Sequence, residues 1–322
     1  MKIVVLDKPR ENPGELNWDA LKTFGSVSIY ERSAAEEIID RIGDAEIVLL
    51  NKAPITKDVL EACPNIRYIG VIGTGYNMVD IKTAGKKGIP VTNVPSYGSE
   101  AIGQHAIALL LEITDHVAHH DAEVRKLRRS GPLDWCFWDY PSIELAHKTM
   151  GIIGLGRIAK TTAYTALGLG MKVIAYTPHP KSEFDGIVEF VELDELYARS
   201  DVICLHCPLF EENYHMINNE SIAKMKDGVI LINNSRGALI EENALAEALT
   251  SGKIYGAGLD TVEHEPISAD NPLLSAPNVF FTPHISWAAL ECRNRLKDYA
   301  IDNLQMFING TPKNIVNSQF FA

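Results

Sequence analysis

Several features are missing from this sequence, and their absence argues against a membrane or nucleic-acid-binding protein. No apolar run approaches the ~20 residues of a membrane-spanning helix, and the longest one, residues 106–113, suits a core helix. The start of the chain, MKIVVLD, is a short strand pattern without the long apolar stretch of a signal peptide. Acidic residues outnumber basic ones, 42 to 30, and the formal net charge of −12 argues against nucleic acid and an anionic membrane as partners.

Cysteine is scarce and odd in number, and we find no internal repeat or low-complexity segment. The five cysteines show no disulfide framework, which favours a reducing environment, namely the cytoplasm. They are Cys63, Cys136, Cys204, Cys207 and Cys292.

The 322 residues are enough for two domains, each with its own core. The first 95 or so alternate apolar strands with helices, which predicts a parallel sheet covered by helices on both faces. Strands are predicted at IVVL, VSIY, EIVLL, IRYIGVIG and IPVTNV, and helices at residues 17–24, 34–42, 57–62 and 80–87. Ligands of such sheets bind beyond the carboxyl ends of the strands, where Asn51, Lys52 and residues 73–76 lie.

A second strand-and-helix region follows a long connection. Residues 99–127 have the pattern of one long helix, and the irregular aromatic stretch GPLDWCFWDYPSIELAH comes next. Later strands read VICLHCP, GVILINN, GAGLD and VFFTPH, with helices at residues 219–225 and 241–251, the latter stopped by Gly252. The final helix, residues 287–309, is long enough to return to the first domain. We therefore expect a first domain of residues 1–98 and 288–322, interrupted by a second domain of residues 99–287.

The second domain contains a dinucleotide-binding pattern, residues 148–177. Gly154, Gly156 and Ala159 have the G-x-G-x-x-G/A spacing between an apolar strand and a helix that begins near Arg157. The first glycine permits the tight turn, the second lets a pyrophosphate approach the backbone, and Ala159 lets the helix pack closely on the strand. The start of the helix offers unpaired N–H groups and its positive dipole end to the phosphates.

One part of this pattern is missing. About 20 residues after the glycines an Asp or Glu usually binds the ribose 2′-hydroxyl, but Thr177 stands there. Without a carboxylate to repel a 2′-phosphate, NADP(H) could be admitted, with His179 and Lys181 available to meet it. No arginine follows immediately, and a threonine hydroxyl can still bond the ribose, so NAD(H) is favoured.

Three polar residues follow predicted strands further along: Arg236 in NNSRG, Glu265 in GLDTVEHEP and His284 in TPHIS. If these strands are parallel, all three emerge at the sheet edge that carries the glycine turn, where a nicotinamide would lie. Reduction of a 2-keto acid needs a cation for the carboxylate, which arginine grips with two hydrogen bonds. It also needs a proton donor for the carbonyl oxygen, which a histidine kept protonated by a neighbouring carboxylate supplies.

Each of the three has a plainer interpretation by itself. Arg236 could form a surface ion pair, His284 could be a strand-end histidine bonded to the backbone, and Glu265 could be a solvated acid in an acidic loop. Their joint occurrence with the glycine turn favours the chemical interpretation.

Together these residues make the sequence resemble the D-isomer-specific 2-hydroxyacid dehydrogenase family over nearly the whole chain. The segments that carry the resemblance are GTGYNMVD, NVP with the following SEAIGQH, GIIGLGRIA, SDVICLHCPL, LINNSRGALI, GLDTVEHEP and TPHISWA. The resemblance implies an α/β protein of two doubly wound parallel-sheet domains. A Rossmann NAD(P)-binding domain would be inserted into a flavodoxin-like substrate domain.

The resemblance also implies the roles of individual residues. Arg236 would hold the substrate carboxylate and carbonyl, and Glu265 and His284 would act as an acid–base pair. The glycine-rich carboxylate loop falls on Thr74 and Gly75, whose backbone N–H groups would bind the substrate. The implied cofactor contacts are Ser99, Gly154, Gly156, Arg157, Ile158, Thr177, Cys207, Pro208, Asn234, Asp260 and His284, of which Asp260 would also tune the site.

Within the family, residues 51–54, 104–105 and 137–141 are most similar to the glycerate dehydrogenase and hydroxypyruvate reductase branch. Lys52 would add positive charge near the substrate carboxylate, with an exposed lysine as the alternative. Trp135 and Trp138 lie on an arm, residues 120–145, that in the family reaches across a dimer. One of them would line the partner's substrate pocket, unless both simply pack in the interface.

The Cys204-Leu205-His206-Cys207 segment suggests a redox or zinc site, but it lies in a predicted apolar strand. Cys204 and His206 would then face one side of the sheet while Leu205 and Cys207 face the other. That alternation suits neither a disulfide nor a shared metal, so we expect structural cysteines and no metal site.

The expected activity is therefore NAD(P)-dependent reduction of hydroxypyruvate or glyoxylate to the D-hydroxy acid, in a cytoplasmic homodimer. A D-lactate-type dehydrogenase stays open, because pocket size cannot be read from one sequence. A phosphoglycerate-type enzyme is less favoured, since no phosphate cluster and no room for a C-terminal regulatory domain are found. A formate dehydrogenase would pair its histidine with glutamine rather than with Glu265. A nucleotide-sensing scaffold like the C-terminal-binding corepressors would keep the same triad, but the sequence shows no disordered tail for such a role.

Overall fold

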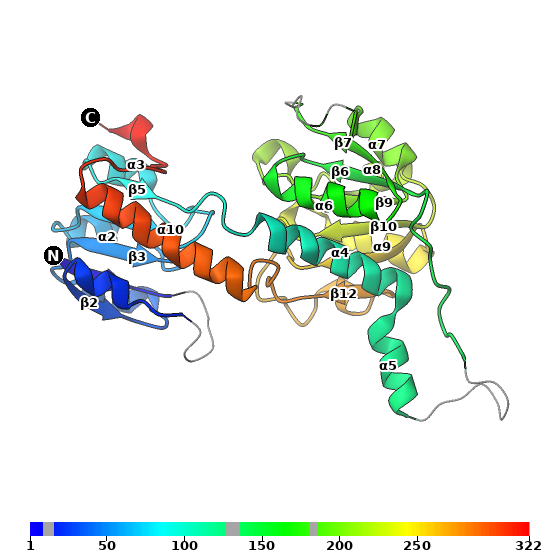
Figure 1. The fold of residues 1–322 in the computed structure, drawn as a ribbon, viewed down its shortest axis with the longest axis horizontal. Coiled ribbons are helices and arrows are strands. Elements are labelled where there is room, and N and C mark those ends of the chain that lie inside the picture. Colours follow the sequence, from blue (N-terminus) through cyan, green and yellow to red (C-terminus); the bar gives the residue numbers. More distant parts are fainter. Residues whose placement is uncertain (9–15, 127–135, 179, 181–183, 185, 322) are drawn as a thin grey trace. The chain divides into compact units, whose positions relative to one another are not determined.

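The computed structural model describes residues 1–8, 16–126, 136–178, 180, 184 and 186–321 (Figure 1). The chain divides into two compact units, Met1–Gly98 with Ala288–Ala322, and Ser99–Trp287. Each unit is built on a parallel sheet covered by helices on both faces, so the predicted α/β class is confirmed.

The first unit has a five-stranded sheet in the order β2-β1-β3-β4-β5. Every neighbouring pair is parallel, and this order is that of flavodoxin-like sheets. The strands are β1 Lys2–Val5, β2 Ser26–Ile29, β3 Ile47–Leu50, β4 Tyr68–Val71 and β5 Val91–Thr92.

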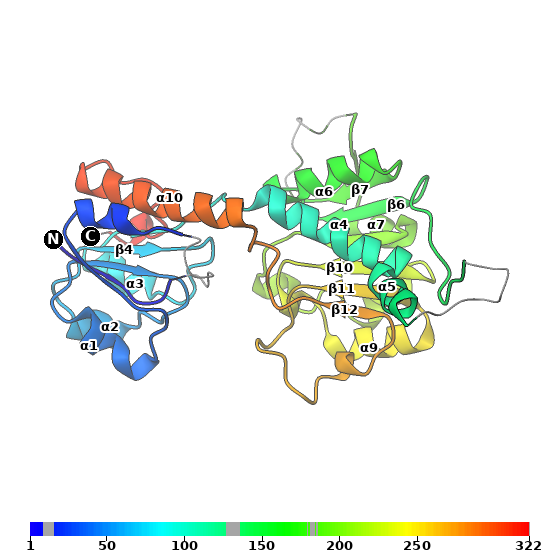
Figure 2. The ribbon, with the colours of Figure 1, turned by 60° about the horizontal axis from the view of Figure 1, so that its bottom comes forward.

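The helices of the first unit cover its sheet from two sides (Figure 2). Val48 and Leu50 of β3 belong to a core shared with α1, α2 and α3. On the other side, the ring of Tyr68 of β4 packs at a tilt against that of Phe307 of α10, with 4.7 Å between the ring centroids. The predicted helix at residues 17–24 is a 3-10 helix, and the one at 34–42 begins as a 3-10 turn. The elements are η1 Asp19–Thr23, η2 Ala35–Glu37, α1 Ile38–Ile42, α2 Lys57–Ala62, α3 Ile81–Lys86, α10 Leu290–Ile308 and η7 Ser318–Phe320.

The second unit has a seven-stranded sheet in the order β12-β11-β10-β9-β6-β7-β8, again parallel throughout. Read from β8, this is the Rossmann order extended by one strand, and the order reverses between β6 and β9. The strands are β6 Thr149–Ile153, β7 Lys172–Tyr176, β8 Glu189–Phe190, β9 Val202–Leu205, β10 Val229–Asn233, β11 Ile254–Leu259 and β12 Val279–Phe281.

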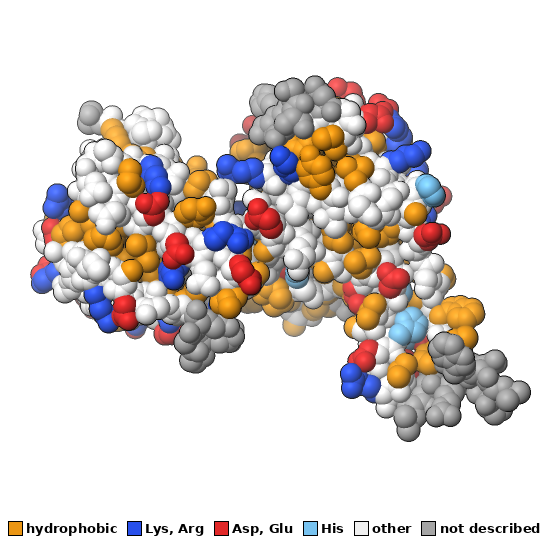
Figure 3. Space-filling view, viewed as in Figure 1, with side chains coloured by type: hydrophobic (Ala, Val, Ile, Leu, Met, Phe, Trp, Pro, Cys, Tyr) orange, Lys and Arg blue, Asp and Glu red, His pale blue; other side chains and the backbone are white. Residues whose placement is uncertain are grey.

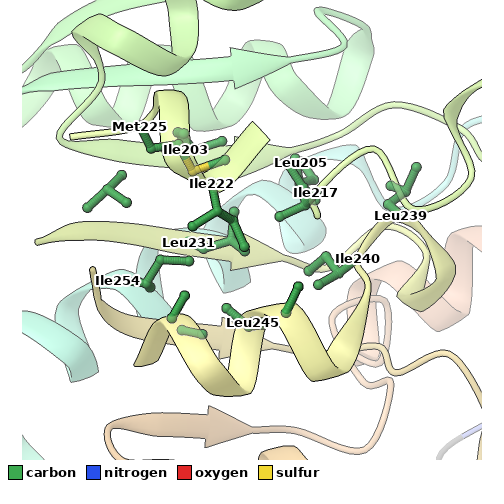
Figure 4. Packing of buried hydrophobic residues seen from close by; sticks show 14 of the residues in the cluster. Ile203, Leu205, Ile217, Ile222, Met225, Leu231, Leu239, Ile240, Leu245 and Ile254 are labelled. Atoms are coloured by element: carbon green, nitrogen blue, oxygen red, sulfur yellow. The ribbon is translucent and has the colours of Figure 1, made fainter. Parts of the chain in front are cut away.

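Both faces of this second sheet are buried, which explains why its strands read as nearly continuous apolar runs. On one face, α4 and α6 cover Ile152 and Ile230. On the other, Ile203 and Leu231 pack among side chains of α7, α8 and α9, including Leu245 (Figure 4). The helices are α4 Ser99–Asp115, α6 Arg157–Gly168, α7 Leu193–Arg199, α8 Asn219–Lys224 and α9 Glu242–Ser251.

Three predictions about this unit were wrong or incomplete. The single helix predicted at residues 99–127 is broken into α4 and α5, Val117–Arg125, because His116 adopts left-handed dihedrals, φ 49° and ψ 44°, that a right-handed helix cannot contain. β9 ends at Leu205, so His206 and Cys207 lie beyond the strand rather than inside it. β8 and α7 were not predicted from the sequence.

Among the helices that the structure describes, none combines the length and the apolar character needed to cross a bilayer.

Candidate active site

The glycine turn lies at the point where the strand order of the second sheet reverses. Gly154 follows β6 with φ +92°, a conformation that favours glycine. A Cβ built on it would lie 2.6 Å from the backbone nitrogen of Cys207, so the turn after β6 touches the segment after β9. Gly156 is the N-cap of α6, and a Cβ there would meet no atom within 4 Å. Protein atoms therefore fill the space next to Gly154, whereas the space next to Gly156 is free of them. That free space fits a pyrophosphate at the start of α6.

Other predicted cofactor residues surround this turn in the second unit. Cys207 and Pro208 follow β9, and the carbonyl oxygen of Cys207 accepts a hydrogen bond from the hydroxyl of Ser235. Asn234 is buried, its Nδ2 donates to the carbonyl of Ile102 at 2.8 Å, and its Oδ1 has no partner among the described residues. A buried amide oxygen without a partner is uncommon and fits a site that still has a polar ligand to receive.

The remaining predicted cofactor residues lie at the ends of helices and strands of the second unit. Arg157 and Ile158 form the first turn of α6, Ser99 begins α4, and Thr177 follows directly on β7. His179 and Lys181, which we considered as partners of a 2′-phosphate, lie outside the described residues.

His284 and Glu265 come together in the same unit. Nδ1 of His284 lies 2.8 Å from Oε2 and 3.0 Å from Oε1 of Glu265. Their side chains are 33% and 34% exposed, so both remain accessible to a small molecule. The opposite ring nitrogen, Nε2, has no hydrogen-bond partner in the described part of the chain. An imidazole ring that is oriented by a carboxylate at Nδ1 and has no partner at Nε2 can donate a proton from Nε2 to a small molecule.

Asp260 holds the turn that carries His284. Its carboxylate accepts hydrogen bonds from the hydroxyl of Thr282 at 2.5 Å, from the N–H of Ile285 at 2.8 Å and from the N–H of Ser286 at 2.9 Å. Its side chain is fully buried. A buried carboxylate is stable only when such donors surround it, so the residues on both sides of His284 are tied to one charge.

The backbone of His284 is fixed as well. Its φ is +55°, its N–H donates to the carbonyl of Thr282 at 2.9 Å, and its own carbonyl accepts from Trp287 Nε1 at 2.9 Å. A histidine in this left-handed conformation persists only where its surroundings enforce it.

Arg236 follows β10 and is exposed. Its Nη1 donates to the neighbouring carbonyl of Ser235 at 2.7 Å, and no carboxylate of the described residues forms an ion pair with it. The plainer interpretation, a surface ion pair, therefore has no support. A Cβ on the next residue, Gly237, would lie 1.9 Å from the carbonyl carbon of Val262. The turn of Arg236 thus packs directly against the loop that leads to Glu265.

That loop is held by Glu263, which the sequence did not single out. Its carboxylate accepts hydrogen bonds from the hydroxyl of Tyr214 at 2.5 Å and from Nε2 of His215 at 3.2 Å, and its N–H donates to Glu242 at 3.0 Å. Burial alone would raise the pKa of Glu263, but the hydrogen bonds from Tyr214 and His215 outweigh it and lower the pKa.

Lys52, Thr74 and Gly75 belong to the first unit, at the carboxyl ends of β3 and β4. The backbone N–H of Lys52 donates to the carboxylate of Asp7 at 2.6 Å. The hydroxyl of Thr74 donates to the carbonyl of Val94 at 2.9 Å. Gly75 is half-buried and Thr74 is exposed.

Asp7 is a second residue that the sequence reading missed. Its buried carboxylate accepts backbone N–H groups from Asn51, Lys52 and Ala53, at 2.6 to 3.2 Å, and so shapes the turn after β3. The available signal was an aspartate placed directly after the apolar run of the first strand.

The cysteines near β9 are enclosed thiols. Burial raises the pKa of Cys204 and raises that of Cys207 to about 11, so neither is a thiolate near neutral pH. Nε2 of His206 lies 3.3 Å from Sγ of Cys204 and 2.8 Å from the hydroxyl of Thr162. Across the described residues, no group of three or more His, Cys, Asp or Glu side chains is arranged to hold a metal ion.

The chain is similar in sequence to known proteins of one family. Residues 107–286 match the D-isomer specific 2-hydroxyacid dehydrogenase, NAD binding domain. A hydroxypyruvate reductase of Blautia hydrogenotrophica is 55% identical over 321 residues, which cover 98% of this chain and all of that protein.

Two solved structures extend the comparison. An acyclic imino acid reductase in complex with NADPH and D-Arg is 29% identical with a TM-score of 0.85, covering 98% of this chain and 100% of that one. The D-lactate dehydrogenase of Aquifex aeolicus, complexed with NAD and lactic acid, is 30% identical with a TM-score of 0.84, covering 98% and 99%. The likeness therefore spans both units of the chain.

Proposed function

Since this chain belongs to the D-isomer specific 2-hydroxyacid dehydrogenase family and is an NAD(P)-dependent oxidoreductase that reduces 2-keto acids, we propose that its substrate is hydroxypyruvate, reduced to D-glycerate. Glyoxylate, reduced to glycolate, is the second substrate of the proposal. The observation that carries the proposed chemistry is the pairing of His284 with Glu265 at the carboxyl edge of the second sheet. The choice of hydroxypyruvate is supported by the relative that shares 55% of its residues with this chain.

In the proposed mechanism the chain's own residues bind the acid and deliver a proton. Arg236 grips the substrate carboxylate with two hydrogen bonds, because no described carboxylate competes for its guanidinium. Nε2 of His284 donates its proton to the carbonyl oxygen, while Glu265 holds Nδ1–H and stabilises the charged ring. The nicotinamide, when bound, supplies the hydride to the carbonyl carbon.

We assign the two units different tasks. The second unit, Ser99–Trp287, would hold the dinucleotide through the glycine turn, and the first unit would bind the substrate. Thr74 and Gly75 would offer backbone N–H groups to the carboxylate, and Lys52 would add positive charge. These assignments are supported by the position of all three residues after strands of a parallel sheet.

NAD(H) is the favoured cofactor and NADP(H) the alternative, and Thr177 is the residue that bears on the choice. Replacing Thr177 with Asp places a carboxylate where a 2′-phosphate would lie, so the KM for NADPH should rise while that for NADH changes little. Comparing the two KM values in the wild type and in Thr177→Asp tests this. A wild type that strongly prefers NADPH would overturn the favoured cofactor.

A substrate panel tests the proposed activity. Consumption of NADH should be fastest with hydroxypyruvate and slower with glyoxylate. The product formed from hydroxypyruvate should be the D-isomer of glycerate. Faster turnover with pyruvate would make the chain a D-lactate-type enzyme, and faster turnover with phosphohydroxypyruvate a phosphoglycerate-type one. No turnover with any 2-keto acid would favour a nucleotide-sensing scaffold.

We further propose that the protein acts as a homodimer in the cytoplasm, joined through residues 120–145. A groove with a volume of about 830 Å³ opens in the second unit between α4, α5 and β12, and its walls include Leu109, Tyr140 and Phe280. Apolar side chains and a histidine lie at the surface around α5 (Figure 3), where Val117 is 62% and Val124 58% exposed. A second copy is the occupant that would cover such a surface.

The arm itself is only partly described. Trp135 lies outside the described residues, whereas Trp138 is 72% exposed and so is available to a partner. Cys63, Cys204 and Cys207 carry free thiols, which supports the proposal of a reducing compartment.

Light scattering of the purified protein tests the dimer. The wild type should have twice the mass of one chain, and Val124→Asp should shift it toward a monomer because a charge would be buried in the interface. Leu274→Asp, at an exposed apolar residue elsewhere in the same unit, is the control and should remain dimeric. A monomeric wild type across the accessible concentrations would rule the dimer out.

A further inference from the structure

We propose that His105 is a positioning residue for this reaction, acting through Thr282 and Asp260 on the turn that carries His284. His105 lies in α4, 179 residues before His284 in the chain. Among the described residues, no hydrogen bond joins the two histidines directly. The inference rests on the proposed role of His284 as the proton donor.

The three side chains form a short hydrogen-bonded series. Nε2 of His105 lies 2.9 Å from Oγ1 of Thr282, and that hydroxyl donates to Oδ1 of Asp260 at 2.5 Å. Nε2 of His105 is also within 3.7 Å of the same carboxylate oxygen. The series therefore runs from a helix on one face of the sheet to the buried charge beneath the turn.

The direction of each hydrogen bond follows from the number of protons. A threonine hydroxyl has one proton, and in this series it goes to the carboxylate of Asp260. Thr282 can then only accept from His105, so Nε2 of His105 must carry a proton. Any side chain that replaces His105 must offer an N–H at that position to keep the series intact.

Loss of this donor would release the turn of His284. Asp260 ties Ile285 and Ser286 from one side and Thr282 from the other. Without His105, the hydroxyl of Thr282 loses the donor that fixes its orientation. The buried carboxylate of Asp260 also loses the positive end of the nearby N–H group of His105. His284 lies between these anchors with a strained φ of +55°, so its ring position depends on them.

Helix α4 is a suitable support because it cannot move toward the sheet. A Cβ on Gly258 of β11 would lie 2.8 Å from Cβ of Leu109, and one on Gly256 would lie 2.8 Å from Cγ2 of Ile113. The two glycines bring α4 into direct contact with β11, the strand that ends one residue before Asp260. A rigid element behind the supporting side chain is what a site needs to keep its geometry.

The decisive comparison is between two amides at position 105. The amide nitrogen of glutamine reaches about as far as Nε2 of histidine, whereas that of asparagine matches Nδ1 and falls short of Thr282. We expect His105→Gln to keep near-normal kcat for hydroxypyruvate, and His105→Asn to lose about 10-fold or more, the size of effect that small misplacements of reacting groups produce. The dissociation constant for NADH and the midpoint of thermal unfolding should stay close in the two variants.

Position 282 supplies an independent pair. Thr282→Val removes the hydroxyl without changing the shape, and Thr282→Ser keeps it, so only the valine variant should lose turnover. In the double variant His105→Asn with Thr282→Val, the loss should be no larger than in the single variants, because both interrupt one series. Leu111→Gln, at an exposed position of the same helix that does not line the groove between α4, α5 and β12, is the control and should keep wild-type kcat.

The possible failures are distinguishable. If the wild type reduces no 2-keto acid, the proposed function fails. If the wild type is active and His105→Asn keeps full kcat, or if the effects at positions 105 and 282 multiply, the positioning role is wrong. Equal losses in His105→Gln and His105→Asn would also overturn it, because an intact donor would then have no value.

Discussion

Nδ1 of His284 lies 2.8 Å from Oε2 of Glu265, although the two residues come from different segments, the loop after β11 and the turn after β12. A carboxylate can only accept at this contact, so Nδ1 carries a proton and Glu265 orients the ring. In the proposed mechanism, the proton transferred to the substrate therefore leaves from Nε2. By binding Nδ1, Glu265 thus leaves Nε2 as the ring nitrogen of His284 that is available to the substrate.

Replacing His284 with Ala should lower kcat by ~10²–10⁴-fold, the usual contribution of a general acid. NADH affinity should fall much less than kcat, since most of the proposed cofactor contacts lie around the glycine turn and not at His284. Steady-state kinetics together with a fluorescence titration of NADH checks both. His264→Ala, at an exposed position in the loop that carries Glu265, is the control. Near-normal turnover of His284→Ala would mean that another group donates the proton.

Arg236→Lys should raise the KM for hydroxypyruvate and lower kcat/KM by about 10-fold or more, because an ammonium cannot form the two parallel hydrogen bonds of a guanidinium. The melting temperature should hardly change, since the side chain is exposed and has no described ion pair. Substrate titrations at saturating NADH measure the first effect and thermal unfolding the second. An equal loss of NADH affinity would assign Arg236 to the cofactor instead.

The two glycines of the turn should respond differently to alanine. Gly154→Ala forces a side chain into φ +92° and against the backbone of Cys207, so it should destabilise the protein by about 1–3 kcal/mol. Gly156→Ala meets no protein atom and has an ordinary φ of −102°, so stability should be kept while NADH affinity falls. Urea unfolding and NADH titration of both variants test this contrast. Undiminished NADH affinity in Gly156→Ala would argue that no phosphate approaches there.

Stability should fall in mild acid because of His206. Burial lowers the pKa of His206 to about 4 from 6.5, so between these values the unfolded chain takes up a proton that the folded chain refuses. The free energy of unfolding should therefore drop as pH falls from 6.5 toward 4, by at most about 3 kcal/mol from this residue, and be unaffected above that window.

His206→Gln, which can still meet the hydroxyl of Thr162, should lose this share of the pH dependence. Urea unfolding of both proteins at about pH 7.5 and about pH 4.5 measures the difference. The same drop in both proteins would show that His206 does not contribute.

Local sequence patterns were sufficient for most of the elements and for the glycine turn, although β8 and α7 were not predicted. Alternating apolar runs and helix patterns act within a few residues of each other, so β6, α6 and β7 could be predicted together with the parallel sheets that follow from them. The same holds for Gly252, which ends α9 at φ +79°. Where a single residue overrides its surroundings the pattern failed, as at His116, whose left-handed backbone splits a continuous helical pattern.

The sequence alone also determined which residue types could perform the chemistry, because Arg236, Glu265 and His284 each follow a strand and parallel strands end at one edge. Only the tertiary structure decided which atoms meet. The 2.8 Å contact of His284 with Glu265, the hydrogen bonds of the buried Asp260 to the turn of His284 and the 2.9 Å contact of His105 with Thr282 join segments far apart in the chain. Side-chain hydrogen bonds of this kind depend on ångström-scale placement by packed helices and strands, and no periodicity in the sequence carries that information.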